Sequence, residues 1–200
     1  RLVATDSYRL AVRDLPGTNV LGHGQKVVIP SRALGELQRL LNQGDEVTLC
    51  LAEDRATFAV GNATLSTSLL QVEFPNYRQL IQPSYPNTLT VAREALLEAV
   101  RRCRIFARET TPVRLEMTAT SLKLSVITQD IGNSEEEIDC SLEGTEMTVG
   151  FNPEYLAAGI EAVTGDEITI QTTDPQRPAV LRGVGAEDYL YLVMPQRLTV

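Results

Sequence analysis

The chain has 200 residues, and its 18 basic and 26 acidic side chains give a formal net charge of -8 at pH 7. A chain of this length buries roughly 70% of the surface that its unfolded form exposes, so it needs no disulfide or metal ion to hold a fold. A pI of about 4.8 argues against a globally basic nucleic-acid-binding surface, and no apolar run reaches the roughly 18 residues of a transmembrane helix.

The chain opens on two short runs that are typical of strands. Residues 2–5 (LVAT) and 8–12 (YRLAV) are predicted strands, and Asp6 and Ser7 form the bend between them. Because this start falls inside a strand pattern, we expect the chain to be a fragment whose natural N-terminus lies far upstream.

One plan of elements then recurs about every 60 residues. Each copy begins with a short β-rich run and continues into apolar residues at helical spacing; the three copies start in residues 27–34, 89–96 and 147–156. An alternating strand follows each helix, and two of these strands nearly repeat each other: residues 44–49 (GDEVTL) and 165–170 (GDEITI).

The expected helix starts are Ser31, Arg93 in a weaker version, and Asn152 followed by Pro153. An Asn side chain accepts an otherwise unpaired N–H at a helix start, and Pro has no N–H to leave unpaired.

Alternation in the strands, as at residues 113–117 and 122–126, indicates one covered face and one wet face. The predicted fold class is therefore α+β, with repeated strand-helix-strand units whose helices pack on antiparallel sheets. A stretch with two prolines and several turn formers separates two patterned regions, so we expect domains at residues 1–82 and 88–200, joined by a linker at residues 83–87.

The sequence contains no strong catalytic motif. The single histidine, His23, lies in a Gly-rich turn without partners at the spacing of a triad or a metal site. Cys50, Cys103 and Cys140 are widely spaced and odd in number, which indicates reduced cysteines rather than disulfides or a zinc site. We predict no cofactor and no metal ion.

Three features leave alternatives open. The acidic run around Glu135 and Glu136 fits either a metal-dependent enzyme or a solvated strand edge. The arginines of the first two helices fit either phosphate contacts or a solvated helix face. The apolar segment 189–195, which is broken by Pro195, fits either a last core strand or the rim of a peptide groove.

Four stretches together resemble the family of bacterial sliding clamps, the beta subunit of DNA polymerase III. They are residues 3–11 (VATDSYRLA), 74–78 (FPNYR), 150–156 (GFNPEYL) and 191–198 (YLVMPQRL). Each is short, but the four follow the family's order on the family's repeat. The family has three similar domains, and this chain resembles the C-terminal part of the middle domain, at residues 1–82, followed by the complete third domain.

The resemblance implies a processivity factor and not an enzyme. Two full-length chains of the family form a homodimer ring that encircles duplex DNA without sequence specificity. The implied partners are the DNA polymerase III catalytic subunit, the clamp loader and other proteins with a clamp motif, and the implied location is cytoplasmic and nucleoid-associated, with no membrane. A structural repeat protein with only a protein-interaction role, or a metal-dependent enzyme using Glu135 and Glu136, are the alternatives.

The resemblance also implies functional residues, carried over position by position. A groove with apolar walls would take Leu or Phe anchors of a partner peptide. Its lining would be Thr5, Ser7, Tyr8, Arg9, Leu10, Pro75, Leu80, Asn152, Tyr155, Pro178, Val193, Met194, Pro195, Arg197 and Leu198. The ring interface would include Ile105, Phe106, Glu135 and Glu136. The DNA-facing residues would be Arg32, Arg39, Arg101 and Arg102.

An arginine-lined inner face is enough for a ring that encloses DNA, so the net charge of -8 does not exclude this partner. We expect the fragment itself to bind DNA only weakly and in a salt-sensitive way. Ser7 and Tyr8 stand where Gly and His are common in the family, and Gln79 stands where a second Arg often follows Arg78. We expect these departures, and the tail at residues 199–200, to alter the preferred motif.

Overall fold

The structure is a computed structural model that describes residues 1–15, 21–22, 25–107, 111–128 and 132–198. His23 and the predicted tail extension at residues 199–200 lie outside the described residues. The chain divides into two compact units, which are described separately. The larger comprises Arg1–Pro16 and Tyr77–Val200, and the smaller comprises Gly17–Asn76.

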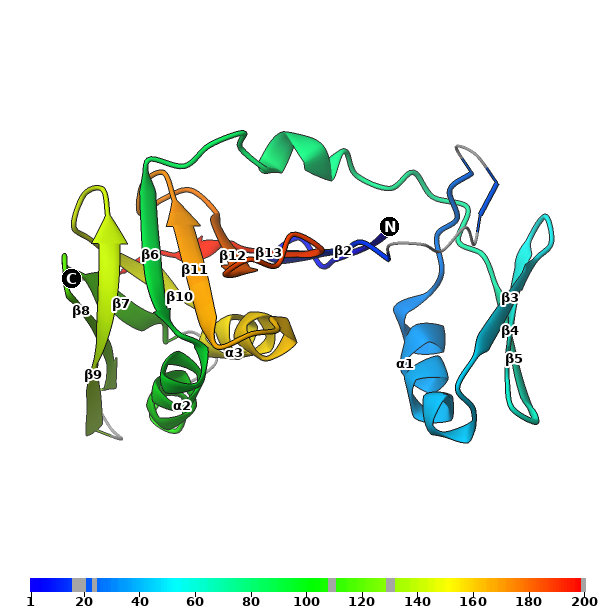
Figure 1. The fold of residues 1–200 in the computed structure, drawn as a ribbon, viewed down its shortest axis with the longest axis horizontal. Coiled ribbons are helices and arrows are strands. Elements are labelled where there is room, and N and C mark those ends of the chain that lie inside the picture. Colours follow the sequence, from blue (N-terminus) through cyan, green and yellow to red (C-terminus); the bar gives the residue numbers. More distant parts are fainter. Residues whose placement is uncertain (16–20, 23–24, 108–110, 129–131, 199–200) are drawn as a thin grey trace. The chain divides into compact units, whose positions relative to one another are not determined.

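Eleven antiparallel strands form the frame of the larger unit (Figure 1). In the order in which they lie side by side, they are β1 (Leu2–Thr5), β2 (Arg9–Arg13), β13 (Tyr189–Val193), β12 (Ala179–Gly183), β11 (Glu167–Thr172), β6 (Asn87–Ala92), β9 (Gly132–Glu143), β8 (Ser121–Thr128), β7 (Val113–Met117), β10 (Met147–Phe151) and β14 (Pro195–Gln196).

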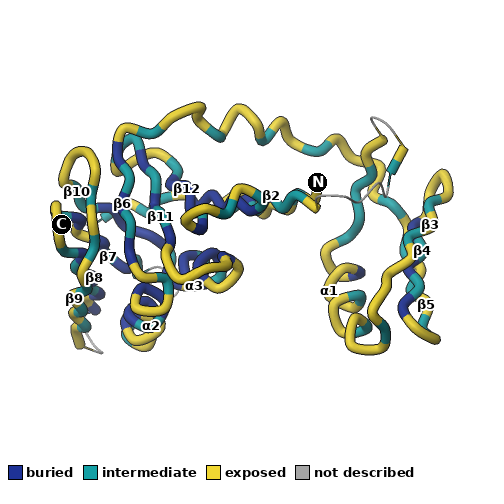
Figure 2. The backbone as a smooth tube through the Cα atoms, viewed as in Figure 1, coloured by how far each residue is buried: buried dark blue, intermediate teal, exposed yellow. Residues whose placement is uncertain are grey.

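The long strand β9 joins the two halves of this frame. Its residues 132–139 pair with β8, and its residues 140–143 pair with β6. Helix α2 (Arg93–Arg104) contacts β6, β7, β8 and β9, and helix α3 (Pro153–Ala162) contacts α2 and β13. Figure 2 shows buried segments on these two helices and on the strands that they contact, so the helices cover the sheet as predicted.

The core of the larger unit follows from the apolar periodicity of its elements. Leu96, Val100 and Cys103 recur at helical spacing on α2 and are fully buried, as are Leu156 and Ile160 on α3. Alternate residues of the strands meet them, since successive side chains of a strand point to opposite faces. The strand predicted at residues 113–117 is confirmed as β7.

A second, smaller cluster holds the first strands of the chain to its last ones. β2 pairs with β13, with Leu10 opposite Leu192 and Val12 opposite Leu190. These four side chains and Val180 are buried together. The 3-10 helix η2 (Tyr77–Leu80) begins with Tyr77, which packs on the cluster. Contacts therefore group residues 1–16 with the C-terminal part of the chain, while the linker at residues 83–87 stays a prediction.

The smaller unit repeats the same plan. Its elements are α1 (Ser31–Leu40), η1 (Leu41–Gln43), β3 (Val47–Leu51), β4 (Arg55–Val60) and β5 (Ala63–Ser68). The strands form an antiparallel sheet in the order β3-β4-β5, and α1 contacts β5. The recurrence of a helix followed by antiparallel strands in both units confirms the predicted α+β fold class.

Two local expectations in the smaller unit are wrong. The β-rich run at residues 27–29 forms no strand; its Val28 carbonyl accepts one hydrogen bond, from the N–H of Leu70 at 2.8 Å. β-branched residues need a neighbouring strand to form a ladder, and none lies beside this run among the described residues. Ser31 is the first residue of α1 rather than its cap; Pro30 occupies the N-cap position without a side-chain hydrogen bond.

The predicted cap of α3 is confirmed. The Oδ1 atom of Asn152 accepts hydrogen bonds from the backbone N–H groups of Glu154 at 2.9 Å and Tyr155 at 3.2 Å, and Pro153 is the first helical residue.

Replacing Asn152 by Ala removes both bonds, so N152A should lower the free energy of unfolding by about 1 kcal/mol. The matched control is S31A, which touches no capping bond and should change that free energy by less than about 0.5 kcal/mol. Urea denaturation followed by far-UV circular dichroism measures both. Equal losses in the two variants would contradict the assigned caps.

Candidate functional site

The bend between β1 and β2 is held by the carboxylate of Asp6. Its Oδ1 accepts hydrogen bonds from the backbone N–H groups of Tyr8 at 3.1 Å and Arg9 at 3.0 Å, and its Oδ2 accepts from Nε of Arg9 at 2.8 Å. This is the local turn that an Asp side chain makes with backbone two or three residues on. Ser7 sits inside it with a positive φ of 75°, and Thr5 donates its hydroxyl to the Arg9 carbonyl at 2.8 Å.

The same turn sets the charge at the site. Burial raises the pKa of Asp6, but the hydrogen bonds from the Arg9 guanidinium and from the two backbone N–H groups outweigh it, so the pKa lies below its ordinary value. Asp6 therefore stays ionised at neutral pH and keeps Arg9 in place.

An aromatic cluster lies beside the turn. The Arg9 guanidinium stands over the Tyr155 ring at 4.4 Å from its centroid, and the Tyr8 and Tyr155 rings stack with centroids 6.1 Å apart. The Tyr191 hydroxyl donates to the Tyr155 carbonyl at 2.8 Å. A side chain at Gly159 would place its Cβ 2.4 Å from the Tyr191 ring, so this glycine lets α3 approach β13 and fixes Tyr155.

The C-terminal segment passes along this cluster. The backbone N–H of Met194 donates to the Tyr8 carbonyl at 2.9 Å. After it, β14 pairs with β10, with Gln196 opposite Gly150. A Cβ at Gly150 would lie 2.6 Å from Cδ2 of Leu198, so the glycine makes room for Leu198.

The structure brings several predicted groove residues together. Tyr8, Arg9, Tyr155 and Met194 are joined by the contacts above, and Tyr8 and Met194 remain 61% and 37% exposed. Others support the surface from below or beside it: Leu10 and Val193 are buried, Asn152 caps α3, Pro178 is half-buried and precedes β12, and Thr5, Ser7, Pro195 and Leu198 flank the cluster in sequence.

Three further groove residues are not joined to the cluster by the contacts described above. Leu80 is exposed at the end of η2, and Arg197 is exposed after β14. Pro75 belongs to the smaller unit. The groove as a whole stays a prediction.

Three residues that build the site are not among the predicted groove residues: Asp6, which was predicted only as part of the bend, Gly159 and Tyr191. The sequence could have indicated the role of Asp6, because an Asp before a bend predicts a turn in which the Asp side chain accepts backbone hydrogen bonds. No sequence pattern could have indicated the close approach of Gly159 to Tyr191, since this approach depends on how α3 packs on β13.

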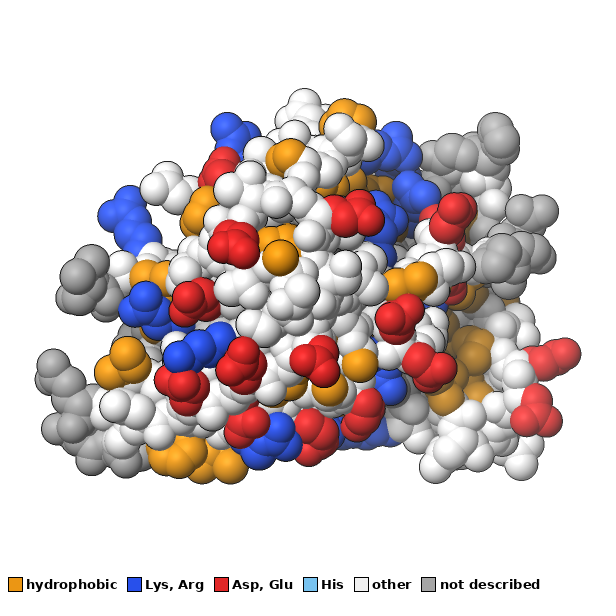
Figure 3. All heavy atoms as spheres, turned by 60° about the vertical axis from the view of Figure 1, so that its left-hand side comes forward, with side chains coloured by type: hydrophobic (Ala, Val, Ile, Leu, Met, Phe, Trp, Pro, Cys, Tyr) orange, Lys and Arg blue, Asp and Glu red, His pale blue; other side chains and the backbone are white. Residues whose placement is uncertain are grey.

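The predicted DNA-facing and ring residues belong to other elements than the cluster. Arg39 of α1 pairs with Glu36 at 2.8 Å, and Arg32 is exposed on the same helix. Arg101 and Arg102 lie on α2 and are paired with glutamates, Ile105 and Phe106 follow α2, and Glu135 and Glu136 lie on β9. On the face that Figure 3 presents, acidic and basic side chains are interleaved rather than gathered by sign.

The acidic pair does not form one site. Glu135 binds Lys123 at 2.8 Å, while Glu136 binds Arg102 through two hydrogen bonds of 2.8 and 2.9 Å. Adjacent residues of β9 point to opposite faces, so the two carboxylates do not converge. Within the described residues, no group of three or more His, Cys, Asp or Glu side chains is placed to hold a metal ion. The same residues contain no helix that is long and apolar enough to cross a membrane.

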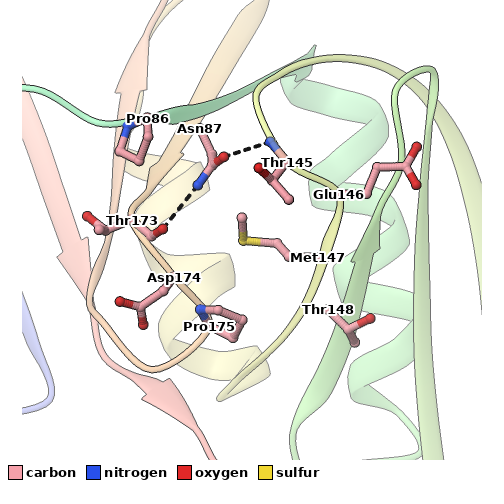
Figure 4. Close-up of a pocket in the computed structure, with 9 residues that line it drawn as sticks. All are labelled: Pro86, Asn87, Thr145, Glu146, Met147, Thr148, Thr173, Asp174 and Pro175. Carbon is pink, nitrogen blue, oxygen red and sulfur yellow. Dashed lines mark hydrogen bonds between the residues drawn. The ribbon is translucent and has the colours of Figure 1, made fainter.

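A shallow pocket of about 470 Å³, shown in Figure 4, is lined by none of the residues of the aromatic cluster. The buried Asn87 forms part of its lining, donating to the carbonyls of Thr172 and Thr173 and accepting from the N–H of Thr145 at 2.8 Å. The side chain is thus fully used in joining three segments, which makes this a structural junction.

Two family models match the chain in tandem. The model described as the DNA polymerase III beta subunit, central domain, matches residues 1–76, and the one described as its C-terminal domain matches residues 78–197. The chain belongs to this family. The resemblance read from the four sequence stretches is confirmed.

Curated relatives agree with this assignment. The beta sliding clamp of Synechocystis sp. is 31% identical over 212 residues, which cover 98% of this chain and 54% of the relative. The beta sliding clamp of Staphylococcus aureus is 29% identical over 198 residues, covering 97% of this chain and 52% of the relative. This clamp-family chain thus spans about half the length of the curated relatives it matches.

Solved clamps share the fold. A sliding clamp from Bartonella birtlesii, bound to griselimycin, has a TM-score of 0.90 at 30% identity and covers 98% of this chain and 54% of its own. A Caulobacter crescentus beta sliding clamp has a TM-score of 0.91 at 25% identity, with coverages of 98% and 53%. The predicted clamp fold is therefore confirmed.

The positive φ of Ser7 gives a test of the turn. A non-glycine residue in this region costs roughly 1–2 kcal/mol, and glycine loses part of the gain through its freer unfolded state. S7G should therefore raise the free energy of unfolding by about 0.5–1 kcal/mol. S7A is the matched control, because Ala keeps the strain and should give no gain. Chemical denaturation distinguishes them, and a gain in S7A as large as that in S7G would contradict the assigned strain.

Proposed function

We propose that this chain is the peptide-binding part of a sliding clamp, a non-catalytic processivity factor that tethers polymerase to duplex DNA. The main support for this proposal is the cluster of Tyr8, Tyr155 and Met194, which come from three distant chain segments and meet at one exposed surface. The proposed partners are duplex DNA, the DNA polymerase III catalytic subunit, the clamp loader and other clamp-motif proteins. A cytoplasmic, nucleoid-associated location follows from the same proposal.

The chemistry of this surface suits a linear peptide. Tyr8 and Met194 offer apolar area on a frame that backbone pairing of β2 with β13 makes rigid. A Leu or Phe side chain of a partner would bury against them, and burial of apolar area supplies most of the binding free energy. Arg9 is held over Tyr155 and by Asp6, so it positions the aromatic wall.

Ligands on related clamps support this proposal. The Bartonella clamp is bound to griselimycin, and the Caulobacter clamp is described with polyethylene glycol bound to a proposed tethering region for the beta motif. Both proteins share this chain's fold over 98% of its length.

The groove is tested by titrating a fluorescent pentapeptide that carries Leu and Phe anchors. M194A should weaken binding about tenfold, because truncating an interface anchor costs on the order of 1–2 kcal/mol. The matched control is V184A, an exposed apolar residue in the turn after β12, which should leave the affinity unchanged. Absence of peptide binding by the folded wild-type chain would refute the proposed function.

The ring interface of the proposed homodimer would use the open edge of β9. Residues 132–139 of β9 pair with β8 on one side, and the described residues provide no strand on the other. Ile105, at the end of α2, is 73% exposed, and Phe106 is half-buried against the core beside it. Glu135 is exposed with Lys123 as its partner. An unpaired strand edge beside an exposed apolar side chain is a template for association.

A chain with the full length of its relatives tests this interface. I105D should shift the protein from dimer to monomer in size-exclusion chromatography with light scattering, because a buried unpaired carboxylate opposes association. V184D is the control and should remain dimeric. A monomeric wild type, or an unaffected I105D, would refute the interface.

A further inference from the structure

One surface of the larger unit, built from α2, α3 and β9, carries oppositely charged residues in pairs. We call it the paired face, and it consists of Arg101, Arg102 and Arg104 with Glu98, Glu136, Glu154 and Glu161.

Each arginine of the paired face is held by a carboxylate. Arg101 donates from Nη1 to Glu98 and from Nη2 to Glu161, both at 3.0 Å, and so bridges α2 and α3. Arg104 pairs with Glu154 at 2.5 Å across the same two helices. Arg102 is held by Glu136 of β9.

These pairs are accessible to a ligand. The side chains of the three arginines are 46–50% exposed, and those of Glu98 and Glu161 are 46% and 50% exposed. Exposed ion pairs are worth at most about 1 kcal/mol, so an incoming anion can exchange for a glutamate. With three arginines against four glutamates, the face has a formal charge of −1.

We propose that Glu98 and Glu161 act as internal competitors for Arg101, keeping the contact of the paired face with duplex DNA phosphates weak and rapidly exchanged. The proposal rests on the proposed clamp function, and it names carboxylates as the residues that limit DNA affinity. Duplex DNA is the occupant because its dense row of phosphates presents several exchange partners at once to arginines that lie along one helix. A weak contact suits a protein that must move along DNA without stopping.

The test is the binding of a short fluorescein-labelled duplex, followed by anisotropy across a series of NaCl concentrations. E98Q/E161Q frees Arg101 and should bind the duplex about fivefold more tightly at low salt. Each newly engaged phosphate should also steepen the plot of log affinity against log salt by about 0.9. Glu98 also lies 3.9 Å from Arg102, which keeps its pair with Glu136 in this variant. Adding R101Q should therefore remove most of the gain, because the guanidinium that lost both of its carboxylate partners is then absent.

The matched control is E143Q/E187Q, which removes two exposed carboxylates with no assigned arginine partner on the paired face. It changes net charge equally and should leave the salt slope unchanged. An equal gain in this control, or a gain that largely survives R101Q, would overturn the inference. The pentapeptide titration is run on the same proteins. Peptide binding by the wild type without a DNA gain in E98Q/E161Q refutes this inference and leaves the proposed function standing. Absence of peptide binding by the wild type refutes the proposed function, whatever the DNA result.

Discussion

The pairing of β2 with β13 is the constraint on which the candidate site depends. It sets Leu10 against Leu192 and Arg9 against Val193, and it buries the small cluster that anchors the first strands to the last. A slip of one residue would turn the apolar side chains of β2 to the opposite face. The register therefore also decides that Tyr8 meets the backbone of Met194 and the ring of Tyr155.

Around that pairing, small residues and hydrogen bonds place the exposed rings. Gly159 lets Tyr191 reach the Tyr155 carbonyl, and Gly150 makes room for Leu198. Both carboxylate oxygens of Asp6 accept hydrogen bonds within the turn before β2. The apolar surface is thus supported by a frame with little conformational freedom, which would lower the entropy cost of the peptide binding that we propose.

Charge on this protein acts locally. A net charge of -8 argues against a globally basic DNA-binding surface, but the relevant quantity is the arrangement of charges on one face. On α2 the arginines are present, and each is neutralised by a glutamate from its own helix, from α3 or from β9. The arginine count of a helix therefore overstates the positive field that a polyanion meets.

The sequence by itself determined the features that depend on near neighbours. The recurring units, the strand at 113–117 and the Asn152 cap all follow from periodicity and from bonds within three residues, and the four family stretches predicted the clamp fold. Tertiary structure decided the rest. Among the described residues the run at 27–29 has no partner strand. Ser31 makes no capping hydrogen bond, and Glu136 pairs with Arg102 while Glu135 pairs with Lys123. These outcomes depend on strand register and on which helix packs nearby. Such contacts join residues far apart in the chain, and the sequence contains no periodic pattern that would predict them.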